Sequence, residues 1–171
     1  MSKKYRQYIF YVSAVLTYLV IHEGTHVIQA LAYGIFQGLR FNGIGVEVLI
    51  TEPLTISGLK LACFSGLSSV VTISVGYVIC VFTPQILALN NRLVKSYLYY
   101  TALVFLLLDP LYIGVVSLFV NGDINGITLG LGLPYTTVRM VYLLVLVINV
   151  FFVVKKLYPK YAENFKDNGK G

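Results

Sequence analysis

The longest uncharged stretch of this chain is residues 61–91, LACFSGLSSVVTISVGYVICVFTPQILALNN. A second region, residues 96–138, contains only two charged side chains, Asp109 and Asp123. Apolar runs longer than about 18 residues are typical of helices that cross a bilayer. Of the 171 residues only 12% are charged and 57% are hydrophobic, whereas soluble proteins are about a quarter charged. The sequence therefore predicts an integral membrane protein.

The length of the hydrophobic segments limits the number of spans. A helix needs about 20 residues to cross the roughly 30 Å of hydrocarbon in a bilayer. We expect an all-α bundle of about four transmembrane helices, at about residues 7–33, 58–82, 96–120 and 134–154. Residues 1–157 then form one polytopic membrane domain, and residues 158–171 form a basic cytoplasmic tail.

The basic residues predict the orientation of these spans. Lys3, Lys4 and Arg6 precede the first span, Arg92 and Lys95 lie between the second and third, and five lysines follow the fourth. Cytoplasmic loops of membrane proteins carry an excess of Lys and Arg, so both termini are expected in the cytoplasm, with the cell membrane as the location. The net charge of +6 is thus explained by topology and by the lipid bilayer, and it requires no nucleic-acid partner.

The segment between the first two spans, residues 34–57, has a different pattern. Several glycines interrupt helical periodicity, and Val46, Val48 and Ile50 alternate with other side chains as in a strand. We expect a short strand-like hairpin or a re-entrant loop at the outer surface. An ordinary outer loop fits the same pattern.

The chain's only two histidines lie in the first hydrophobic segment, in the sequence His22-Glu23-Gly24-Thr25-His26. Positions i and i+4 of a helix share one face, so both imidazoles can bind one Zn²⁺ at about 2.0–2.1 Å. Glu23 occupies the position of the general base in the HExxH motif. Ionisable side chains at this depth of a bilayer are costly unless they face a cavity or a partner, which favours a functional site.

A catalytic zinc needs a third protein ligand, and without another histidine this ligand should be a carboxylate. The other acidic residues belong to the outer loop or the tail, which leaves Asp109, before Pro110, and Asp123, between Gly122 and Asn125. Each aspartate also has a structural explanation. Asp109 is in a position to satisfy the backbone group that Pro110 leaves without a partner, and Asp123 has the surroundings of a turn residue. We favour Asp123 as the ligand, with Asp109 as the alternative and Asn125 as a residue that supports the ligand.

The HEGTH motif in a first span, followed by a glycine-bearing strand-like loop and a late membrane aspartate, resembles the site-2 protease family of intramembrane zinc metalloproteases. Members of that family usually carry a second motif that joins an Asn and a Pro to a Leu-Asp-Gly. This chain offers Leu108-Asp109-Pro110 and Gly122-Asp123 instead, which is typical of a divergent member.

The resemblance implies a zinc-dependent endopeptidase that hydrolyses peptide bonds of transmembrane protein substrates. In that mechanism Glu23 takes a proton from the attacking water and passes it to the leaving amine. Two other interpretations fit the sequence: a zinc-binding membrane scaffold without proteolytic activity, and a small transporter or channel subunit that uses Glu23, Asp109 and Asp123 as polar pathway residues.

Overall fold

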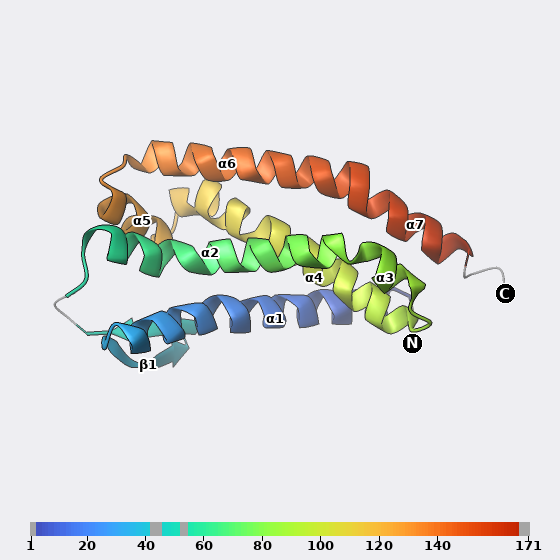
Figure 1. Cartoon of the computed structure of the whole chain (residues 1–171), viewed down its shortest axis with the longest axis horizontal. Coiled ribbons are helices and arrows are strands. Elements are labelled where there is room, and N and C mark those ends of the chain that lie inside the picture. Colours follow the sequence, from blue (N-terminus) through green and yellow to red (C-terminus); the bar gives the residue numbers. More distant parts are fainter. Residues whose placement is uncertain (1–2, 42–45, 52–54, 168–171) are drawn as a thin grey trace.

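The computed structural model describes residues 3–41, 46–51 and 55–167, and it shows a helical bundle with one small sheet. Within these residues four long helices run along the molecule (Figure 1): α1 Lys3–Ala32, α2 Gly58–Val81, α4 Arg92–Gly114 and α6 Tyr135–Phe152. Three short elements lie between them: α3 Thr83–Ala88, the 3-10 turn η1 Val116–Leu118, and α5 Asp123–Leu131. The start of α1 and the end of the last helix, α7, lie at one end of the bundle, and α5 and the sheet lie at the other (Figure 1).

Three helices of the described part are long and apolar enough to cross a membrane, by length and composition: Gly58–Val81, Arg92–Leu118 and Tyr135–Lys166. They correspond to the second, third and fourth predicted spans. The first predicted span, residues 7–33, lies within α1 except for its last residue, and α1, a helix of 30 residues, is not among these three. Polar residues in the second half of α1, including His22 and Glu23, lower its hydropathy.

The last apolar helix is longer than the sequence predicted. After α6 the chain continues through a π-helical turn, η2 Val153–Leu157, into α7 Tyr158–Asp167. Tyr161 is only 2% exposed and packs with Leu157 and Leu106 in one apolar cluster. The described part of the predicted basic tail is therefore a helix that packs on the bundle, while residues 168–171 of that tail lie outside the described residues.

The strand-like hairpin expected after the first helix is present. Strand β1, Phe36–Phe41, pairs antiparallel with β2, Val46–Ile50, and a bulge between Phe36 and Gly38 shifts the register. Arg40 lies opposite Glu47, and their side chains form an exposed ion pair of 2.7 Å. Residues 42–45, between the two strands, lie outside the described residues. Ile35, at the base of the hairpin, packs with Ala30 of α1 and Phe64 of α2.

Pro110 lies inside α4, next to a polar contact between α4 and α6. Proline has no N–H, so the carbonyl of Leu106, four residues earlier, loses its helical donor. The fully buried Asn149 of α6 replaces that donor, because its Nδ2 donates to Leu106 O at 2.6 Å. Tyr77 of α2 donates to Asn149 Oδ1 in turn. The carbonyl freed by the proline is therefore satisfied by Asn149, and Asp109, the residue suggested by the sequence, has a different role.

Candidate metal centre

Helix α1 presents both histidines on one face toward the interior of the bundle. His22 is 7% exposed and His26 is 6% exposed, and their ring centroids lie 5.2 Å apart. This is the arrangement that the i, i+4 spacing predicts. The ring of Phe64 from α2 packs against His26, with the centroids 5.2 Å apart. The two imidazoles are therefore largely shielded from solvent between α1 and α2.

Asp123, the first residue of α5, completes a cluster with these two rings. Its Oδ2 lies 3.2 Å from His22 Nε2, and its Oδ1 lies 3.4 Å from His26 Nε2. The contact between His22 Nε2 and Asp123 Oδ2 is a hydrogen bond in this structure, and ligands at 2.0–2.1 Å from a tetrahedral zinc lie at a similar separation, about 3.3–3.4 Å. One ligand atom from each of the three residues lies within 4.8 Å of the other two. The donor set, two imidazoles and one carboxylate, is thus one that could hold a divalent metal ion.

Glycines bring α5 close enough to α2 for Asp123 to reach the histidines. A Cβ atom at Gly126 would lie 2.8 Å from Ser65 Cβ, and one at Gly130 would lie 2.6 Å from the carbonyl oxygen of Gly58. These are closer than any ordinary contact, so only glycine fits at both positions. The Gly-x-x-x-Gly spacing places both on one face of α5, the device by which small residues let helix backbones approach closely. The position of Asp123 beside the two histidines therefore depends on the close contact between α5 and α2.

Asp109, the alternative ligand, lies on the opposite side of the His22 ring. It is fully buried, and its Oδ1 lies 3.2 Å from His22 Nδ1, whereas Asp123 faces Nε2 of the same ring. Tyr18 donates to Asp109 Oδ1 at 2.6 Å, and Thr72 of α2 donates to Oδ2. A carboxylate at Nδ1 keeps the ring proton there and leaves the Nε2 lone pair for a metal. Asp109 thus occupies the position of a residue that orients a ligand.

Tyr18 and Thr72 are the two members of the site that sequence reasoning missed. Tyr18 precedes His22 by four residues, so it lies on the same face of α1, and its hydroxyl is 3.1 Å from His22 Nδ1. That spacing in the sequence was a signal from which Tyr18 could have been identified. Thr72 had none, because only the packing of α2 on α4 brings it to Asp109.

Glu23 follows His22 directly and is half-buried. It forms no hydrogen bond or ion pair with any described residue, and it interacts electrostatically with His22, His26 and Asp123. A carboxylate that lies beside the cluster without ligating it is available for proton transfer.

Asn125 does not support Asp123 in the way the sequence suggested. Its Oδ1 accepts a hydrogen bond of 3.0 Å from Tyr135, and it forms none with Asp123. Asn125 therefore ties α5 to the start of α6. Arg139 of α6 likewise donates to the carbonyl of Ser117 at 2.7 Å and to its hydroxyl at 3.1 Å, so it secures the end of the α4 segment.

The arrangement combines two imidazole nitrogens, one carboxylate and a neighbouring carboxylate, Glu23, that has no hydrogen-bond partner among the described residues. These are the parts that metal-assisted hydrolysis requires. Comparison of the chain with protein-family models, with curated proteins and with solved structures finds no match to any of them.

Proposed function

We propose that this chain is an integral membrane zinc metalloendopeptidase that cleaves transmembrane protein substrates. His22, His26 and Asp123 hold Zn²⁺, Asp109 orients His22, and Glu23 is the general base. The observation that carries the proposal is the position of the two Nε2 atoms, 3.2 and 3.4 Å from the two oxygens of one carboxylate.

The exposed faces of the helices support placement in a bilayer. On α1 the outward positions Val12, Leu16 and Val20, spaced four residues apart, are between 53% and 73% exposed. On α6 the large apolar side chains of Leu144 and Val147 are 61% and 65% exposed. Continuous apolar stripes of this kind are costly in water and are satisfied by lipid. We therefore assign four spans, with α1 as the first.

The distribution of basic residues between the two ends of the bundle supports cytoplasmic termini. The start of α1, the start of α4 and α7 meet at one end of the bundle (Figure 1). Most of the basic residues belong to these segments, and the positive-inside rule places them at the cytoplasmic surface. His22 lies roughly 24 Å further along α1 than Arg6, at 1.5 Å per residue. The metal centre is then toward the outer half of the bilayer.

The chemistry follows from the positions of the side chains. Zinc supplies a Lewis acid that polarises a peptide carbonyl and activates water. Glu23, which has no hydrogen-bond partner in the described part of the chain, removes a proton from the attacking water and delivers it to the leaving amine. Asp109 holds the proton on His22 Nδ1, so that ring stays a neutral ligand while Glu23 changes its charge.

The hairpin is a suitable place for an unwound substrate segment. A transmembrane helix must unwind before cleavage, because its carbonyls are engaged in internal hydrogen bonds. The β1–β2 hairpin packs through Ile35 against Phe64, which also contacts His26. Each strand of a two-stranded sheet keeps one unpaired edge, and an extended peptide can add to such an edge. Cleavage that survives replacement of residues 36–50 by a plain linker would argue against this role.

The substitution Glu23→Gln tests the proposal in the purified full chain. We expect bound zinc to remain near its wild-type content while cleavage of a model transmembrane substrate is lost, because the amide cannot accept the proton. Glu163→Gln, the same change at an exposed site on α7, should leave both unchanged. Cleavage that persists in Glu23→Gln would contradict the assigned mechanism. Zinc binding without cleavage in the wild type would favour the scaffold interpretation.

A further inference from the structure

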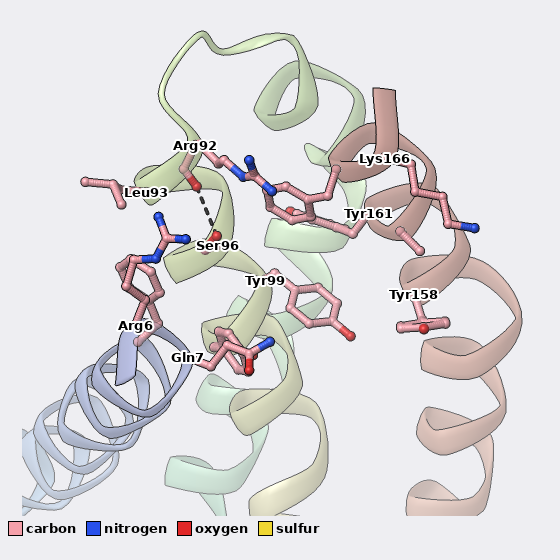
Figure 2. Close-up of a pocket in the computed structure, with 13 residues that line it drawn as sticks. Arg6, Gln7, Arg92, Leu93, Ser96, Tyr99, Tyr158, Tyr161 and Lys166 are labelled. Atoms are coloured by element: carbon pink, nitrogen blue, oxygen red, sulfur yellow. Dashed lines mark hydrogen bonds between the residues drawn. The ribbon is translucent and has the colours of Figure 1, made fainter. Parts of the chain in front are cut away.

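A pocket of about 350 Å³ lies at the end of the bundle away from the metal centre. Figure 2 shows it between the start of α1, the start of α4 and α7. Aromatic side chains form much of its wall, among them Tyr99 and Phe165. Three cationic side chains also line it, one from each helix: Arg6, Arg92 and Lys166.

These cations have no counter-charge among the described residues of the pocket. None of the described residues that line it is acidic, and neither Arg6, Arg92 nor Lys166 forms an ion pair in the part of the chain that the structure describes. The guanidinium of Arg92 lies 5.3 Å from the centre of the Phe165 ring, which holds it beside the pocket. Unpaired charges that surround a partly apolar space favour the binding of an anion.

A buried lysine adds to the positive potential at the same place. Lys95 lies three residues after Arg92 on α4 and is only 5% exposed. Its ammonium group donates to Asn164 Oδ1 at 2.9 Å and is paired with no carboxylate among the described residues. Arg92, which lines the pocket, is therefore one helical turn from a second cation that has no carboxylate partner among the described residues.

We propose that the pocket binds the phosphate headgroup of an anionic phospholipid from the cytoplasmic leaflet. Arg6 and Arg92 approach from two helices, and guanidinium groups match the oxygens of a phosphate. The acyl chain lies along Phe10 and Leu93, which line the same pocket. Tyrosines at this level are typical of the headgroup region. The inference rests on the proposed membrane placement and is independent of the metal centre.

Native mass spectrometry of the detergent-purified full chain tests the proposal with two lipids of identical acyl chains, phosphatidylglycerol and phosphatidylcholine. The wild type should prefer phosphatidylglycerol. A cation near a headgroup contributes about 1 kcal/mol, so Arg6→Gln combined with Arg92→Gln should lower that affinity roughly thirty-fold. Arg6→Gln alone, at a side chain without hydrogen bonds in the described part, should lower it roughly fivefold.

Lys155→Gln combined with Lys156→Gln is the matched control, because it removes two exposed cations outside the pocket. It should change the affinity by less than about threefold. An equal loss in both double variants would overturn the proposal, as would a wild type that binds the two lipids alike. Displacement of the lipid by an equal concentration of inorganic phosphate would also overturn it. Zinc content, measured on the same samples, should not change, which separates this test from that of the metal centre.

Discussion

Replacement of Gly130 by alanine should weaken metal binding without touching a metal ligand. The new Cβ would lie 2.6 Å from the carbonyl oxygen of Gly58, whereas ordinary contacts begin at 3.4 Å. The backbone nitrogen of Ala62 would lie closer still, and backbone atoms of α2 cannot yield as a flexible side chain would, so α5 must move by at least about 0.8 Å. Metal sites tolerate changes in ligand distance of only about 0.2 Å. Asp123, the first residue of α5, therefore leaves its position beside the histidines.

We expect Gly130→Ala to lower zinc affinity at least about tenfold, within the 10–100-fold range found when the support of a ligand is disturbed. Overpacking should also cost about 1–3 kcal/mol of stability. Competition with a chromophoric chelator measures the affinity, and thermal unfolding measures the stability.

Gly66→Ala is the matched control at the same interface between α2 and α5. The nearest atom to its added Cβ is Ile127 Cγ1 at 3.5 Å, an ordinary contact, so zinc affinity should stay at the wild-type value. Wild-type affinity in Gly130→Ala would refute the reasoning that close helix approach positions Asp123. An equal loss in Gly66→Ala would show that the interface is sensitive to any added atom.

Three further outcomes follow from the same contacts. Asp109→Asn should lower zinc affinity about 10–100-fold in the chelator assay. Three donors face the carboxylate, and the amide NH₂ of asparagine would face one of these donors and so loosen His22. An unchanged affinity would remove Asp109 from the site. Asn125→Ala should leave zinc affinity within about twofold, since its side chain hydrogen-bonds toward α6; a tenfold loss would restore its predicted role. Asn149→Leu should destabilise the chain by about 1–2 kcal/mol in thermal unfolding, because the Leu106 carbonyl loses its donor; an unchanged stability would contradict that account of the proline in α4.

The long helices were predictable because their signal is local. Apolar runs and their flanking charges locate α2 and α6 to within a few residues of the predicted 58–82 and 134–154. The helix α5 was not predicted, because a nine-residue segment that begins with an aspartate after Gly122 and contains further glycines has the composition of a turn. Its helical state depends on packing against α2.

The candidate site likewise has one part that the sequence predicted and one part that it could not. The pairing of His22 with His26 follows from helix geometry alone, so the sequence predicted it. The choice between Asp109 and Asp123 could not be made from depth. Asp123 is 101 positions from His22 along the chain and Asp109 is 87 (109 − 22), so only tertiary packing determines which ring nitrogen each one faces. The structure places Asp123 at Nε2 and Asp109 at Nδ1.

The zinc content of the purified full chain, measured by mass spectrometry, tests the central claim most directly. The claim is that His22, His26 and Asp123 hold one metal ion. It predicts about one zinc per chain in the wild type and in Glu163→Gln, and loss of that zinc in His26→Ala and in Asp123→Ala. A well-folded wild type without zinc, or an Asp123→Ala variant that keeps its zinc, would contradict the claim.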